Sequence, residues 1–256
     1  GIYVDGFYSP NPLAADFDLI SVNGIQVLKG PQGTLFGRNT TGGAILVSTR
    51  EPNTESNSFE GRASYGRYNE ARVEGIANIV VSDRVAISVE GQYRRGDGWQ
   101  RDFLTSRKVG KYENWSARVS LKADLTDDVT LLLRYKHGEV NDPSPLLTAT
   151  YVDSDVGIGA PFGGIPGTFT THKNKVASDL QPEFFHSNSD VLQATLTADL
   201  GFATLTSYSQ YRNEKVNASQ DIDYSAVNLF QLGLPNNNYT WSQEFLLTSN
   251  PGTKLQ

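Results

Sequence analysis

The sequence predicts an all-β protein whose strands cross a lipid bilayer as an antiparallel β-barrel, and three observations lead to this fold class. Beyond Arg50, apolar and hydrophilic residues alternate with a period of two instead of the 3.6-residue period of a helix. Most of the alternating runs have ten residues or more, whereas a globular strand has about 5 to 6 and a tilted membrane-crossing strand about 9 to 11. The connections between the runs are alternately short and long, which is typical of outer-membrane barrels.

The period-two pattern defines about eight strands. In the clearest one, Ile87 and Val89 alternate with Ser88 and Glu90, so that one face of the strand is apolar and the other hydrophilic. The other runs repeat this arrangement. The predicted strands lie near residues 58–66, 70–81, 84–96, 113–124, 129–139, 188–199, 202–213 and 239–249.

The connections predict the two ends of the barrel. The joins at 82–83, 126–128 and 200–201 are tight. Those at 97–112, 140–187 and 214–238 are long. Because successive hairpins of a barrel end on opposite sides of the membrane, this alternation predicts short periplasmic turns and long external loops. The short join near 66–69 breaks the rule once.

The composition argues against several classes of function and site. The chain has 256 residues, a net charge of -6 and a pI near 5, which argues against a nucleic-acid partner. It has no cysteine, so thiolate metal sites and cysteine nucleophiles are excluded. No segment approaches the roughly 18 apolar residues of a membrane helix. Because methionine is also absent, we expect the chain to be part of a longer product.

The stretch KGPQGTLFGRNTTGGA, residues 29–44, raises the alternative of a phosphate-binding loop. Its spacing matches neither a P-loop nor a dinucleotide fingerprint, and it leads into the β-branched run AILVST in place of a helix. Its glycines are more simply interpreted as tight turns and close backbone contacts.

The same residues carry a resemblance. The run from Ile25 to Ile45 resembles the second half of the plug domain of TonB-dependent outer-membrane receptors, and residues 1–6 resemble a plug strand. Residues 242–249, SQEFLLTS, look like a barrel strand of that family. The shared turn motif comprises Gly30, Pro31, Gly33, Gly37, Gly42 and Gly43.

The resemblance implies a plug inside a 22-stranded barrel, of which about eight strands are present here. Residues 1–52 are then expected to form the C-terminal part of the plug, and residues 53–256 the first part of the barrel. It also implies import of a scarce nutrient, most simply an iron-siderophore, with energy from a TonB-type partner that acts through a region outside this chain. The location is then the bacterial outer membrane, in contact with its lipid, and neither enzyme activity nor a cofactor is expected.

The resemblance further implies a latch between plug and barrel, in which a plug arginine is held by glutamates of the inner wall. By position Arg38 matches the arginine and Glu244 one glutamate. Alternatively, Arg38 caps a turn carbonyl and Glu244 faces water in the lumen. The hydrophilic faces of the strands supply further lumen charges, any of which could bind plug or solute: Glu74, Glu90, Arg94, Arg118, Lys122, Arg134 and Lys136.

The 48-residue connection 140–187 is the candidate substrate surface, since loops this long are often functional. Aromatic rings on a glycine-rich backbone suit stacking against a siderophore, a macrocycle or a sugar, and they equally suit packing of the loop over the barrel mouth. The candidates are Tyr151, Phe162, Phe169, His172, Phe184, Phe185 and His186. The three histidines are not spaced as metal ligands, so no metal site is predicted.

Two other classes of protein remain as alternatives. A passive or structural outer-membrane barrel would share the strand lengths but lack the plug motif. A soluble carbohydrate-binding β-sandwich would pair its apolar faces inside one core.

Overall fold

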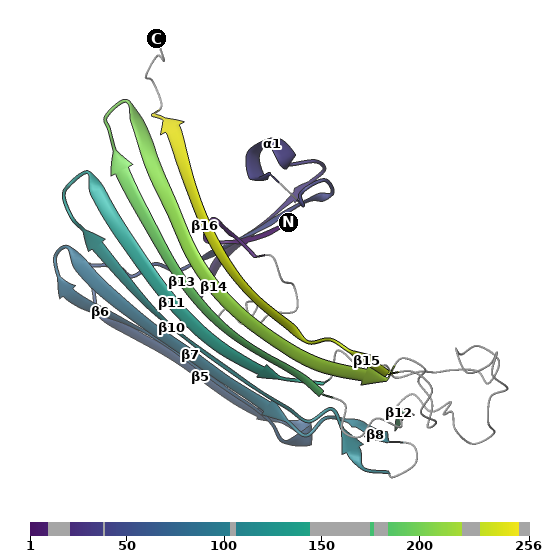
Figure 1. Ribbon diagram of the computed structural model, residues 1–256. Helices are drawn as coiled ribbons and strands as arrows, with labels where there is room; N and C mark the ends of the chain where they lie inside the picture. Colours follow the sequence, from purple (N-terminus) through teal and green to yellow (C-terminus); the bar gives the residue numbers. More distant parts are fainter. Residues whose placement is uncertain are drawn as a thin grey trace.

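The computed structural model describes residues 1–9, 21–37, 39–102, 106–143, 175–176, 184–221 and 231–250. They form three sheets, and the four-stranded sheet lies on the inner, concave side of the long curved one (Figure 1). Among these residues, no helix is both long and apolar enough to cross a membrane.

The four-stranded sheet contains β1 (Ile2–Val4), β2 (Phe7–Tyr8), β3 (Val22–Lys29) and β4 (Gly43–Thr49), in the order β2-β1-β4-β3. β1 pairs antiparallel with β2 and parallel with β4, and β3 pairs antiparallel with β4. The short helix α1 (Gly33–Phe36) lies in the β3–β4 connection and packs on β1, where the Tyr3 hydroxyl donates to the Phe36 carbonyl at 2.5 Å. We call this sheet with α1 the plug sheet.

The curved sheet, called the wall below, contains eight long strands. They are β5 (Ser58–Gly66), β6 (Glu70–Ser82), β7 (Val85–Gly96), β10 (Tyr112–Asp124), β11 (Val129–Asn141), β13 (Phe184–Asp199), β14 (Ala203–Asp221) and β16 (Asn236–Ser249). Each pairs antiparallel with the next in that order. The three-residue β15 (Gln231–Gly233) continues the edge beside β14, and η2 (Arg67–Asn69) forms the β5–β6 turn.

The eight predicted strands are therefore all present. The first five agree with the prediction to within two residues at each end, but β13 begins at Phe184 and β14 continues to Asp221. These extensions escaped prediction because the alternation reverses there: inward Phe185, Val216 and Ala218 are apolar, whereas most outward residues are hydrophilic. On the inner face, Phe185, Val216 and Ala218 pack in a small apolar cluster that supports them.

Part of the predicted long loops is ordered in a third sheet. It contains β8 (Gln100–Asp102), β9 (Lys108–Val109) and β12 (Lys175–Val176). β8 lies between the other two, antiparallel to β9 and parallel to β12. Residues 101–102 of the first long connection thus pair with residues 175–176 of the second.

The two faces of the wall differ in chemistry. The outward face exposes large apolar side chains in its middle, followed toward the long-loop end by Tyr93, Trp115, Tyr135, Tyr211 and Trp241. The inner face is polar and buried, with residues such as Ser88, Glu90, Arg118 and Arg134. Apolar side chains outside and aromatic rings at one rim are the arrangement of a membrane-crossing barrel wall. The outward apolar faces pair with no second sheet among the described residues, which argues against the β-sandwich alternative.

Candidate functional site: the plug–wall hub

The contact between plug sheet and wall begins at a two-residue turn. Asp5 and Gly6 connect β1 to β2 with φ values of 52° and 86°, the left-handed backbone that Asp-Gly hairpin turns require. The ring of Tyr208 lies against Gly6, so close that an added Cβ would be 2.8 Å from a ring carbon. Phe7 packs edge-on against the same ring, with 5.5 Å between centroids. The turn is therefore pressed against β14 of the wall.

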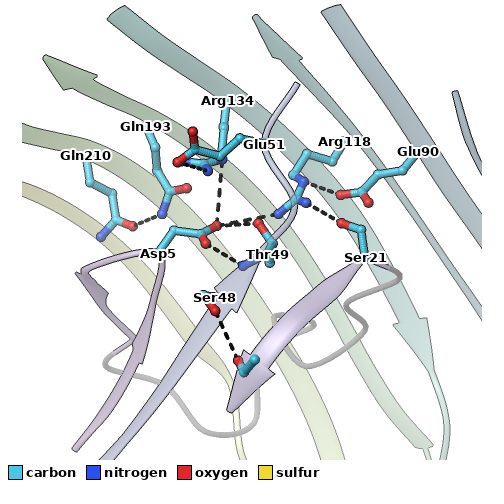
Figure 2. Close-up of polar contacts among 11 residues, drawn as sticks. Asp5, Ser21, Ser48, Thr49, Glu51, Glu90, Arg118, Arg134, Gln193 and Gln210 are labelled. Carbon is cyan, nitrogen blue, oxygen red and sulfur yellow. Dashed lines mark hydrogen bonds and ion pairs between the residues drawn. The ribbon is translucent and has the colours of Figure 1, made fainter. Parts of the chain in front are cut away.

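Asp5 organises the polar part of this contact (Figure 2). Its carboxylate accepts hydrogen bonds from the Thr49 N–H and the Thr49 hydroxyl, both at 2.7 Å, and so joins the β1–β2 turn to the end of β4. The same carboxylate lies 3.7 Å from Arg118 and 3.7 Å from Arg134 of the wall. Since all three side chains are more than nine-tenths buried, these charges are poorly screened by water.

Arg118 ties a second plug strand to the wall. Its Nη2 donates to the Ser21 hydroxyl at 2.8 Å, directly before β3 begins. Its Nε forms an ion pair with Glu90 on the neighbouring strand β7. Because Arg118 contacts both Ser21 and Asp5, one guanidinium holds the ends of two plug segments.

Glu51 completes the group at the exit from the plug sheet. Its carboxylate lies 3.5 Å from Lys122 and 3.9 Å from Arg134. We call Asp5, Ser21, Thr49, Glu51, Glu90, Arg118, Lys122 and Arg134 the hub. Within it the wall provides three cations and one carboxylate, and the plug side provides the other two carboxylates. Removal of the plug would leave two wall cations without a counter-charge, which strongly favours its retention.

The linker that follows is fastened to the first wall strands. Arg50 forms two hydrogen bonds with the Glu60 carboxylate of β5, at 2.5 and 2.9 Å. These bonds raise the pKa of Arg50 above its usual value, so the guanidinium stays charged. Asn78 of β6 accepts from the Asn53 N–H and donates to the Asn53 and Ser56 carbonyls. The linker therefore leaves the plug sheet along a fixed path.

Three of the five glycines in the predicted turn motif have a left-handed backbone. Gly30, Gly37 and Gly43 have φ values of 84°, 74° and 136°. At Gly43 an added Cβ would be 2.3 Å from the Leu28 carbonyl oxygen, so only glycine fits there. Gly33 begins α1, and Pro31 and Gly42 lie in the connecting segments on either side of it. The segment shapes the end of the plug sheet that is remote from the hub.

The predicted latch stays a prediction. Arg38 lies outside the described residues. Glu244 lies on β16 opposite Tyr208 and shares its inner face, so it points toward the side that carries the plug. The hub that the structure does describe has the reverse polarity, with carboxylates on the plug side and mostly cations on the wall.

The predicted substrate contacts are only partly described. Tyr151, Phe162, Phe169 and His172 lie outside the described residues. Phe185 is buried in the apolar cluster with Val216 and Ala218, which corresponds to the packing alternative for that residue. Phe184 and His186 alternate with it and lie on the outward face. No group of three or more potential ligands in the described part of the chain could hold a metal ion.

Sequence reasoning placed Glu90, Arg118, Lys122 and Arg134 on the inner face but could not select them as plug contacts. It missed Asp5, Ser21, Thr49 and Glu51 altogether. One signal was available for Asp5: an Asp-Gly pair between two short apolar runs predicts a tight turn.

Comparison with known proteins gives a local match in sequence and a broad match in fold. No family model matches the chain. The pesticin receptors of Yersinia pestis and Yersinia enterocolitica are 40% identical to it over 55 residues, which are 21% of this chain and 8% of each receptor.

Solved structures match along nearly the whole chain. The siderophore receptor PiuA from Acinetobacter baumannii superposes with a TM-score of 0.74 at 15% identity, over 98% of this chain and 35% of that one. The ferric yersiniabactin uptake receptor FyuA from Yersinia pestis gives 0.73 at 16% identity, over 92% and 34%. The ferric-catecholate import receptor Fiu from E. coli K12 gives 0.63 at 18% identity in its closed form, over 96% and 34%. The chain thus spans about a third of the length of these structures.

Proposed function

We propose that this chain is part of the plug and barrel of a TonB-dependent outer-membrane receptor, and that this receptor actively imports iron-siderophore complexes. Its place is the bacterial outer membrane, where strands with apolar outward faces form barrels. Residues 1–52 are the later part of the plug, and residues 53–256 are the first part of the barrel.

The hub is the observation that carries the proposal. A barrel that conducts passively needs an open lumen, whereas here a folded sheet lies against the inner wall and is held by buried charges. Ion pairs of this kind hold firmly at rest, yet they need no covalent chemistry to release. Opening them requires work that the outer membrane itself does not supply, which supports an energy-transducing partner of the TonB type.

The proposed cargo follows from the descriptions of the solved structures to which this chain is similar. PiuA is described as a siderophore receptor, FyuA as a ferric yersiniabactin uptake receptor and Fiu as a ferric-catecholate import receptor. We extend a siderophore substrate to this chain, with Tyr151, Phe162, Phe169 and His172 as candidate contacts and Arg38 and Glu244 as a second latch. The outward position of Phe184 and His186 and the burial of Phe185 do not favour a direct contact with cargo.

The test uses the full-length parent in a strain without its other siderophore receptors. We expect growth on iron-limited medium when the matching siderophore is supplied, and uptake of the ⁵⁵Fe complex that stops when the proton-motive force is collapsed. Uptake that continues after the collapse would identify a passive barrel. Unchanged growth with every siderophore tested, together with uptake of a non-iron nutrient, would move the cargo to another class.

A further inference from the structure

The wall carries a concentration of positive charge where β7 ends and β10 begins. Residues 94–111 contain six of the chain's 22 lysines and arginines but two of its 28 aspartates and glutamates, although the whole chain has a net charge of -6. This segment includes the end of β7 and the strands β8 and β9, and β8 lies beyond the end of β7 (Figure 1). Arg95, Lys108 and Lys111 are exposed members of the group, and we call these three the basic rim.

The basic rim lies directly beyond aromatic side chains of the outward face. Tyr93 and Trp115 are register partners on β7 and β10, and Arg95 follows Tyr93 by two residues, so it lies on the same face. Lys111 is the diagonal neighbour of Arg95, because Arg95 pairs with Glu113. Aromatic residues on a membrane-crossing wall mark the depth of the lipid headgroups. The cations therefore lie at the headgroup level on the long-loop side.

The nearby carboxylates leave most of this charge unpaired. Glu113, which faces Arg95 across the strand pair, accepts a hydrogen bond from the Tyr93 hydroxyl at 3.0 Å. Asp97 lies 3.6 Å from Lys108. Within the described part of the chain, the other two cations of the basic rim form no ion pair. They are thus free to bind an anion from outside the protein.

A furrow crosses the lipid-facing surface on the other side of the aromatic pair. Gly75, Gly91 and Ala117 are successive register partners on β6, β7 and β10. They lie between the aromatic pair and the row that contains Val89 and Val119. The furrow is open at Gly91, because a Cβ added there would have no heavy atom nearer than 3.7 Å. Small and aliphatic side chains of this kind give van der Waals contacts to an acyl chain.

We propose that the basic rim and the furrow together bind a lipid of the external leaflet that has a phosphorylated headgroup. The guanidinium and ammonium groups hold the phosphate, and the furrow takes an acyl chain. A free phosphate would use the cations but not the furrow, so we assign the site to a lipid. Because β6, β7 and β10 have a paired strand on both sides, the site requires no further strand. It depends on the membrane-crossing wall and on no particular cargo.

Native mass spectrometry of the full-length parent in detergent tests the headgroup contact. Phosphatidic acid, which has a phosphate monoester, should bind more tightly than phosphatidylcholine with the same acyl chains. Arg95→Gln should weaken the binding of phosphatidic acid about fivefold, and Arg95→Gln/Lys111→Gln roughly 30-fold. Both side chains are exposed and unpaired, so these variants are expected to fold. Lys215→Gln is the matched control, since Lys215 lies in the same outward row as Trp115 but beside Asp190, and it should leave the affinity nearly unchanged.

Two alanines on the outward face of β10 test the furrow. Ala117→Leu fills it and should lower the fraction of protein with phosphatidic acid bound. Ala123→Leu, on the same face near the short-turn end, should not. Glycerol phosphate, which has the phosphate but no acyl chain, should not displace the lipid.

Equal binding of the two lipids, or an unchanged affinity in the double variant, would overturn the proposal. Displacement by glycerol phosphate, or equal effects of Ala117→Leu and Ala123→Leu, would overturn the assignment to a lipid. None of these measurements involves iron uptake, so they are independent of the proposed siderophore function.

Discussion

Single residues in the hub combine the roles of turn former, strand connector and charge partner. Asp5 adopts a left-handed turn conformation, bonds Thr49 and faces two arginines, all with one short side chain. A longer glutamate would have to displace the arginines, and an uncharged residue would leave them without compensation. The hub therefore depends more on Asp5 than on any other plug residue described.

We expect Asp5→Asn to weaken plug retention in the full-length parent. Removal of one partner from a buried ion pair costs about 3 to 5 kcal/mol; Glu51 and Glu90 still face the arginines, so the lower end applies. Protease accessibility of the plug during a urea titration should begin at a clearly lower urea concentration. Asp127→Asn, in the exposed pair with Arg84, should cost at most about 1 kcal/mol. Equal losses of stability in the two variants would contradict the role of the hub in holding the plug.

A second residue-scale prediction concerns Gly43. Gly43→Ala combines an unfavourable positive φ with a clash against the Leu28 carbonyl, and should destabilise the plug sheet by about 2 to 3 kcal/mol. Gly42→Ala is the neighbouring control, because nothing lies within 4 Å of its added Cβ and its φ is ordinary. Chemical unfolding of the two variants in the same detergent measures the difference, and similar midpoints would disprove the close approach.

At the scale of elements, the two faces of each wall strand are adapted to different environments, lipid outside and a polar interior inside. Val119 lies on the outward face in the middle of β10, whereas Asn213 lies on the outward face of β14 beyond the aromatic rim. Val119→Arg should cost about 2 to 4 kcal/mol, and Asn213→Arg about 0 to 1, because the penalty for a charge on the lipid face depends on depth. The free energy of unfolding of the two variants in lipid vesicles measures this difference. A similar small cost at both positions would place β10 outside the bilayer.

The pairing of β14 with β16 includes a polar group on the outward face. The Gln243 amide donates to the Ser207 hydroxyl at 2.9 Å and accepts from the Ser209 hydroxyl at 2.5 Å. Gln243→Leu should therefore destabilise this strand pair by about 1 to 3 kcal/mol, because two hydroxyls lose their partner at a lipid-facing position. The triple variant Ser207→Ala/Ser209→Ala/Gln243→Leu should recover most of that loss. Unfolding of the single and triple variants in lipid vesicles measures this recovery of stability. A triple variant less stable than the single variant would contradict the prediction.

At the scale of the whole molecule, wall and plug sheet depend on each other and on lipid. The wall buries few apolar side chains and exposes many on its outward face, so water is a poor solvent for it. We expect the protein to stay in the membrane fraction after washing with alkaline carbonate and to require detergent for extraction. A monodisperse, freely water-soluble product would contradict the membrane-crossing wall.

Much of this fold could be predicted from the sequence because strands and short turns are determined by residues that are close together along the chain. Alternation along Val85–Glu90 reflects lipid on one side and a polar interior on the other, and short turns such as 82–83 follow from hairpin geometry. The ends of β13 and β14 could not be predicted, because their support comes from Phe185, Val216 and Ala218 on neighbouring strands.

The sequence by itself determined the mainly β class, the existence of the eight wall strands, the faces they present and the presence of tight turns in the glycine-rich segment, but not the short helix α1 inside it. Only the tertiary structure decided which inner charges meet the plug. Lys136 and Arg134 lie on the same face of the same strand, so alternation alone does not select Arg134 as a partner of Asp5. The reason is physical: alternation fixes the face of a side chain, but the height at which the plug sheet sits against the wall depends on strand register and on contacts between residues about 100 positions apart.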